Sequence, residues 1–368
     1  MKRQKSKFIF AVLTFICASV TVFAQTTPTP TPTPKVEEEV LKIESRLVVV
    51  PVSVTDANGL PVTGLKAQDF RIAEENKNQE IAQVSDAEKV PLEIALLFDI
   101  SASTDSMFQF EKDTAAQFLR EVMRPEDRAT IITVGESPVI VQARNTAENA
   151  AISIKTIQPT KQFTAFYDTV SAAANYLQKN APQGTRKVII VISDGEDTNS
   201  DGIRRGFSDL YASLGSDINS LTTKMLEEKR NEVKSREQSK VLRNLQNADT
   251  VFYSINPAGN SYQLNKMSVF GQSNLQRFAD ETGGTSFLPK FQPIDLKDNF
   301  QNSTNTKKNQ EILTKIFRQL TNELQAQYLV QYYSEGDFPN NKYVKLDVGL
   351  TNPNNLKVRA RQGYFVKK

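Results

Sequence analysis

The chain has 368 residues, with 45 lysines and arginines against 42 aspartates and glutamates, and a formal net charge of +3. It contains one cysteine, no histidine and no tryptophan. These counts exclude histidine-based catalytic triads and any intramolecular disulfide. A chain of this length has room for two domains, each with a core of its own.

The first 24 residues are predicted to be a secretory signal peptide. Four basic residues precede an apolar run from Phe8 to Phe23, and Ala24 ends a small-residue cleavage pattern. The run is short for a membrane-spanning helix, and no other stretch is apolar enough, so we expect no integral membrane segment in the mature chain. We therefore expect an exported protein that is periplasmic or extracellular.

Removal of the signal peptide changes the charge of the chain. Its four charged residues are all basic, so the formal net charge falls from +3 to −1. A mature chain that is nearly neutral gives no electrostatic reason to expect nucleic acid as a partner.

Residues 25–38 are predicted to be a linker rich in threonine and proline. Prolines 28, 30, 32 and 34 alternate with threonines, a pattern typical of an extended polyproline-II spacer. We expect this segment to provide distance and no binding surface.

Both ends of the mature chain have the composition of short β-strands. Residues 39–90 contain strand-like runs at 47–54, 69–72 and 81–84, with a tight turn predicted at Asp56–Gly59 and a return strand at Leu60–Val62. Residues 327–368 contain further runs at 327–333, 342–350 and 356–366. Short strands at one end cannot form a stable core alone, so we predict that both sets pair into one small β-sandwich.

Residues 91–326 alternate between strand-like and helical patterns. The runs Ile94–Phe98 and Val188–Ile192 are apolar without alternation, which is typical of strands covered on both faces. This predicts an α/β domain with a doubly wound, mostly parallel sheet of Rossmann-like type, inserted in or flanked by the sandwich. Residues 139–143 are predicted to be an edge strand.

Two polar segments of this domain complete the prediction. Residues 205–247 form an insertion with helical spacing of apolar residues followed by a dense mixture of charges. We expect one long helix or two broken helices, which either form a solvated face or contact a partner. Residues 295–308 are predicted to be a loop, and 309–325 the closing helix.

Polar residues follow the first buried strand at the point where it ends. Asp99, Ser101 and Ser103 stand there, and ligands of parallel sheets bind at the carboxyl ends of strands. The motif resembles the Asp-x-Ser-x-Ser of the metal-ion-dependent adhesion site (MIDAS) in von Willebrand factor A (VWFA) domains. The resemblance adds Asp194, at the end of the second buried strand, and Thr164, before a predicted helix.

The resemblance thus implies a metal site made of Asp99, Ser101, Ser103, Thr164 and Asp194. Oxygen ligands without sulfur or imidazole suit Mg²⁺, with Mn²⁺ or Ca²⁺ as alternatives. Only two ligands are charged, so the cation would be incompletely neutralised. Water at an open position could then be replaced by a carboxylate from another molecule. The chain departs from the family at Gln162 and Phe163, where glycines are usual. The alternative is that the two serines cap the next helix and the aspartates accept backbone hydrogen bonds.

The order of segments, ending in Arg359–Phe365, resembles exported bacterial VWFA-related proteins abundant in Acidobacteria. The resemblance implies an adhesion-type, protein-binding module whose cation engages an Asp or Glu of a protein ligand. The alternative is a structural component of the cell envelope in which the metal only stabilises the fold. We do not expect an enzyme, because Glu196 and Asp197 are predicted to hold the turn after the strand.

Overall fold

The computed structural model describes residues 46–86, 89–101, 105–160, 162–257, 266–293 and 297–367. They belong to the second of two compact units, Glu44–Lys368. The predicted signal peptide, the linker and Ser103 lie outside the described residues. Within them, no helix combines the length and the apolar character needed to cross a membrane.

The centre of the fold is a six-stranded sheet in the order β10-β9-β8-β5-β6-β7. The first five strands of this order run parallel, and the edge strand β7 is antiparallel, which confirms the predicted mostly parallel sheet. The bounds are β5 Leu92–Asp99, β6 Arg128–Val134, β7 Val139–Asn145, β8 Arg186–Ile192, β9 Thr250–Ile255 and β10 Ser286–Phe287.

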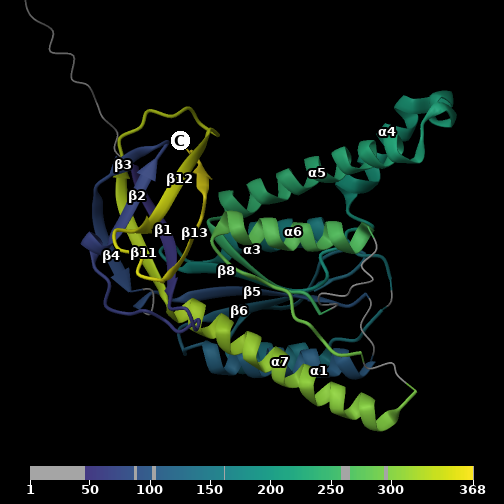
Figure 1. Cartoon of the computed structure of the whole chain (residues 1–368), viewed down its shortest axis with the longest axis horizontal. Helices are drawn as coiled ribbons and strands as arrows, with labels where there is room; N and C mark the ends of the chain where they lie inside the picture. The colour runs from purple at the N-terminus through teal and green to yellow at the C-terminus, as the bar shows by residue number, and fades with distance from the viewer. Residues whose placement is uncertain are drawn as a thin grey trace, which may run out of the picture. The chain divides into compact units, whose positions relative to one another are not determined.

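Helices cover both faces of this sheet, so its central strands are apolar on both sides (Figure 1). Alternate residues of β5 enter different cores: Leu96 packs with α1, α2 and α7, whereas Leu97 packs with α3, α5 and α6. The bounds are α1 Asp105–Val122, α2 Ala147–Thr156, α3 Phe166–Asn180, α5 Thr223–Asn247, α6 Lys266–Thr282 and α7 Asn299–Gln325.

The predicted insertion consists of two helices, α4 (Asp201–Leu214) and α5, joined by the 3-10 turn Gly215–Ser220. All buried residues of α5 lie from Val233 onward. The buried residues of α4, Ile203 and Gly206, lie in its first half. The first half of α5 therefore extends with the second half of α4 beyond the core, as Figure 1 shows.

Strands from both ends of the described chain combine in two four-stranded sheets, β13-β1-β11-β4 and β14-β12-β2-β3. Their inner faces share one apolar core that includes Val50, Ile72, Val330 and Leu346. A β-sandwich therefore flanks the α/β part, as predicted. The bounds are β1 Arg46–Thr55, β2 Phe70–Glu74, β3 Lys77–Gln79, β4 Ile81–Asp86, β11 Gln327–Ser334, β12 Tyr343–Leu350, β13 Lys357–Ala360 and β14 Gly363–Phe365.

Two local predictions were wrong. The predicted return strand at 60–62 makes only a single bridge, between Thr55 and Pro61. The predicted loop at 295–308 is helical from Asn299, because Asp298 caps the helix by accepting hydrogen bonds from the amides of Phe300 and Gln301. The polar composition of this turn was misleading, since the buried Asn305 amide donates to the carbonyl of Pro293.

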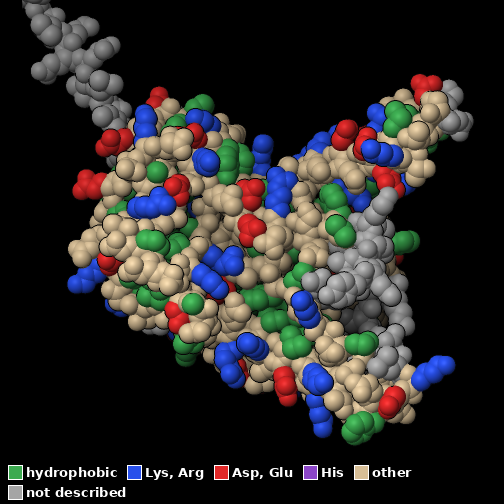
Figure 2. Space-filling view, in the orientation of Figure 1, with side chains coloured by type: hydrophobic (Ala, Val, Ile, Leu, Met, Phe, Trp, Pro, Cys, Tyr) green, Lys and Arg blue, Asp and Glu red, His purple; other side chains and the backbone are tan. Residues whose placement is uncertain are grey.

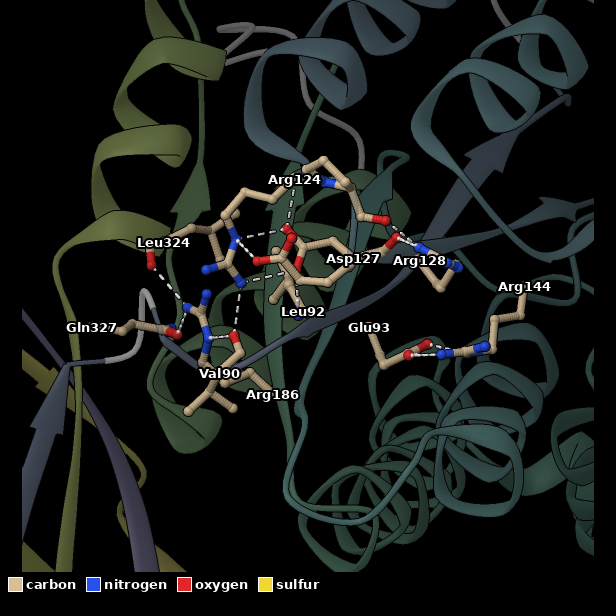
Figure 3. A network of polar contacts seen from close by, with 12 residues as sticks. Val90, Leu92, Glu93, Arg124, Asp127, Arg128, Arg144, Arg186, Leu324 and Gln327 are labelled. Atoms are coloured by element: carbon tan, nitrogen blue, oxygen red, sulfur yellow. Dashed lines mark hydrogen bonds and ion pairs between the residues drawn. The ribbon is translucent and has the colours of Figure 1, made fainter.

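A polar network ties the amino ends of the central strands together (Figure 3). Asp127 accepts hydrogen bonds from the amide of Leu92 (2.7 Å) and from the Arg124 side chain. Arg186 Nη1 donates to the Leu324 carbonyl (2.9 Å) and to Gln327 Oε1 (3.0 Å). Arg186 thus fixes the corner at which α7 leads into the sandwich strand β11.

Candidate functional site

The carboxyl ends of β5 and β8 bring Asp99 and Asp194 to the same edge of the sheet. Phe98 pairs with Ile192 in the parallel ladder, so the next residues, Asp99 and Ser193, lie side by side. Ser193 Oγ donates to Asp99 Oδ2 at 2.6 Å. Pairing of the two strands therefore joins residues that are almost a hundred positions apart in the sequence.

Asp99 is held by three hydrogen bonds. Besides the Ser193 bond, its Oδ1 accepts from the Ser101 amide (2.9 Å) and from Ser101 Oγ (2.7 Å). Burial nevertheless raises the pKa of the Asp99 carboxyl above its ordinary value. These bonds hold the side-chain oxygens of Asp99 and Ser101 close together, and the same contacts also satisfy the non-metal alternative for these two residues.

Asp194 lies in a similar environment. Its Oδ1 accepts a hydrogen bond from the Glu196 amide at 3.0 Å. Burial raises the pKa of Asp194 to about 6, with the negative charges of Asp99 and Glu196 adding to the rise. A cation between the two carboxylates would offset this repulsion, so the donor set fits a divalent ion.

Thr164 lies in the loop before α3. This loop is hydrogen-bonded to the segments that follow β5, β6 and β8. Thr164 donates its amide to Thr198 Oγ1, and its carbonyl accepts from the amides of Thr198 and Asn199. The neighbouring Ala165 amide donates to the Gly135 carbonyl at 2.7 Å. The loop bonds therefore place the fourth described ligand candidate at the same sheet edge as the two aspartates.

The departure from the family pattern leaves this loop intact. The Phe163 side chain is 65% exposed, and its backbone does not adopt the left-handed conformation that favours glycine. A side chain at this position therefore causes no backbone strain and points into solvent.

Sequence analysis missed Ser193 as a positioning residue. Its hydroxyl donates to Asp99 and accepts from the Gly195 amide (3.0 Å). The following Gly195 has φ +75°, and a Cβ there would lie 2.4 Å from the Gly271 carbonyl oxygen of α6. Only glycine fits this turn. The glycine after Asp194 was therefore the sequence signal that α6 lies close to the backbone at this point.

Asp197 holds the loop between β8 and α4 in place and is not one of the predicted cation ligands. Its carboxylate accepts hydrogen bonds from the Tyr167 amide (2.7 Å), the Ser200 amide and the Ser200 hydroxyl. These contacts connect the start of α3 to the start of α4, in keeping with the turn-holding role expected for Asp197. Burial raises the pKa of its carboxyl.

Of the five predicted ligands, the structure describes four at one sheet edge, and Ser103 lies outside the described residues. In the described part of the chain, no group of three or more His, Cys, Asp or Glu is placed to hold a metal ion. The candidate site instead combines two carboxylates with hydroxyls.

Solved structures that resemble this chain include proteins from bacteria and from the mussel. An aerotolerance-related membrane protein from Bacteroides fragilis is 17% identical, with 61% of this chain and 99% of that chain covered and a TM-score of 0.32. The proximal thread matrix protein 1 from the mussel byssus, with a zinc-occupied MIDAS motif, is 13% identical, with 66% of this chain and 47% of that chain covered and a TM-score of 0.39. A mutant of the PilB minor pilin from Streptococcus sanguinis is 14% identical, with 64% of this chain and 62% of that chain covered and a TM-score of 0.41.

No curated protein matches the chain. A family model does match its central part. That part runs from β5 through α3 to the loop after β8, and all five predicted ligands fall inside it. Residues 94–196 match the model of the von Willebrand factor type A domain.

Proposed function

We propose that the protein is an adhesion-type, protein-binding module that holds a divalent cation at the carboxyl edge of its central sheet. Asp99, Ser101, Ser103, Thr164 and Asp194 would hold the ion. The proposal is supported chiefly by one observation: Asp99 and Asp194 end neighbouring parallel strands, with serine and threonine residues at the same edge.

The donor set favours Mg²⁺, with Mn²⁺ or Ca²⁺ as alternatives, because all of the side chains present oxygen. Asp99 and Asp194 supply the charge, and the hydroxyls are neutral ligands. A cation bound in this way keeps affinity for a further anionic ligand. We infer that this ligand is an Asp or Glu side chain of a partner protein.

Binding, and not catalysis, is the proposed role. The carboxylate oxygens of Asp197 are occupied by the hydrogen bonds that start α3 and α4, so this residue is poorly suited to act as a general base. Export to the periplasm or the cell surface, inferred from the N-terminal sequence, would place the module where adhesion partners occur.

Calorimetric titration of Mg²⁺, Mn²⁺ and Ca²⁺ into chelator-treated protein tests the proposal. We expect saturable binding of one cation by the wild type, loss of binding in Asp99→Ala, and wild-type behaviour in Asp209→Ala, an exposed aspartate of α4. Absence of binding in the wild type, or binding that Asp99→Ala leaves unchanged, would contradict it.

Thermal unfolding with and without chelator separates binding from a purely structural role. If the ion only stabilises the fold, chelation lowers the melting temperature, and capture of acidic protein ligands is unaffected. If the proposal holds, chelation and Asp99→Ala both abolish that capture.

A further inference from the structure

A cleft lies at the amino ends of the central strands, at the opposite side of the sheet from Asp194. Its volume is about 520 Å³, and it runs between β1 and β11 of the sandwich and the first residues of β8 and β9. Apolar side chains line the sandwich side, among them Leu47, Val49 and Leu329. Leu47 is 47% exposed and Val49 37% exposed, so this floor is open to solvent.

The charges that line the cleft are almost all positive. Five arginines and lysines face one acidic residue, Asp249. Asp249 already pairs with Arg361 (2.9 Å) and Lys367 (3.6 Å). The cleft therefore carries an excess of positive charge, and burial together with the charges of Lys367 and Arg361 lowers the pKa of Lys187.

Two nitrogens at this cleft lack a partner. Within the described part of the chain, Arg46 Nη1 and Arg361 Nε are buried and make no hydrogen bond. Buried guanidinium nitrogens without acceptors are costly. Both guanidinium groups add positive charge to the lining of the cleft.

The cleft runs along an edge of β1 that no described strand covers. β13 pairs only with residues Val52–Thr55 of β1. The preceding residues Arg46–Pro51 pair with β11 on one side, and no described strand pairs with their other side. Instead, Arg361 Nη2 donates to the Val49 carbonyl at 2.8 Å, as the amide of a paired strand would.

We propose that this cleft binds an extended acidic peptide segment of a partner protein. Six residues of β1 span roughly 20 Å, which suits a strand and exceeds the length of a small anion. Successive side chains of an extended peptide point to opposite sides. Acidic side chains on one side would meet Lys187, Arg46 and Arg361, and apolar ones on the other would pack on Leu47 and Val49.

The test uses a capped hexapeptide of sequence Glu-Val-Glu-Val-Glu-Val, a Lys-Val peptide of the same length, and succinate as a small dicarboxylate. Of the three, we expect only the acidic peptide to bind saturably, with an affinity that falls as the salt concentration is raised. If succinate competes as well as the peptide at equal carboxylate concentration, the cleft holds a small anion and the proposal is wrong.

Variants locate the binding. Lys187→Gln should weaken the acidic peptide about tenfold, the effect of losing one charge-assisted contact, and Leu47→Glu should weaken it by like-charge repulsion. Lys345→Gln, an exposed lysine of β12 outside the cleft, should bind as the wild type does. Equal affinity in all three variants would overturn the proposal, provided that their melting temperatures match.

This cleft is independent of the proposed cation site. Peptide binding should persist in Asp99→Ala and in the presence of chelator. Loss of peptide binding on chelation would assign the peptide to the cation site and would overturn the proposal for the cleft.

Discussion

Glu323 is a carboxylate that folding removes from water. Its side chain is 4% exposed and accepts a hydrogen bond from Thr285 Oγ1 at 2.5 Å. Burial raises its pKa above the ordinary 4.5, and the hydrogen bond from Thr285 only partly offsets that rise. The residue lies near the end of α7, beside the sandwich, where its backbone carbonyl accepts from Ser53 Oγ.

The raised pKa of Glu323 predicts a specific pH dependence. The folded state binds this proton more tightly than the unfolded state, so the contribution of Glu323 to the free energy of unfolding rises as pH falls through the raised pKa. The gain is complete below 4.5. Urea unfolding of the wild type and of Glu323→Gln should show a difference in the free energy of unfolding that shrinks as pH falls through this range. A difference that is independent of pH would contradict the raised pKa.

At the scale of elements, α4 and α5 are held together by a close approach at Gly206. A Cβ at this position would lie 2.5 Å from Val233 Cγ1 and 3.1 Å from the Arg236 guanidinium. The contact brings α4 against the first buried residue of α5. The small residue is therefore what lets the two helices of the insertion pack.

Gly206→Ala should be destabilising although alanine is the better helix former. Replacement of an interior helical glycine by alanine usually stabilises by about 1 kcal/mol, but here the added methyl group overlaps Val233. We expect a lower urea midpoint for Gly206→Ala and an unchanged or higher one for Ser208→Ala on the exposed side of α4. A gain in stability for Gly206→Ala would show that α5 yields at this contact.

At the scale of the whole described unit, Arg186 joins the α/β part to the sandwich. It is the first residue of β8, and its guanidinium donates to the end of α7 and to the first residue of β11. The described strands of the sandwich share no strand pairing with the central sheet, so contacts such as those of Arg186 hold the two parts against each other. Figure 3 shows the bonds around this corner.

Arg186→Met keeps the apolar stem but leaves the Leu324 carbonyl and Gln327 Oε1 without this donor. We expect a loss of about 2–3 kcal/mol in the free energy of unfolding, measured by urea denaturation, and faster proteolysis at the corner between α7 and β11. Arg128→Met, which loses bonds to the carbonyls of Pro125 and Asp127 near the surface, should lose less. Equal losses would argue against a joining role for Arg186.

The central sheet and part of the candidate site were predictable from local pattern. The uninterrupted apolar runs of β5 and β8 require cover on both faces, and the order of strands and helices then favours a parallel sheet. Asp99 was singled out because it ends such a run, and the resemblance to VWFA domains added Asp194 at the end of the second run. The start of α7 was not predictable, because buried asparagines such as Asn305 resemble loop residues until their partners are known.

By itself, the sequence determined which strands are central and which carboxylates stand at their ends, since burial on two faces and strand termination are local properties of the chain. Tertiary structure alone decided that Ser193 holds Asp99 and that Thr164 is bonded to the loop after β8. It also gathered Arg46, Lys187 and Arg361 around one cleft. These contacts join residues far apart in the chain, and only strand pairing and packing place them together.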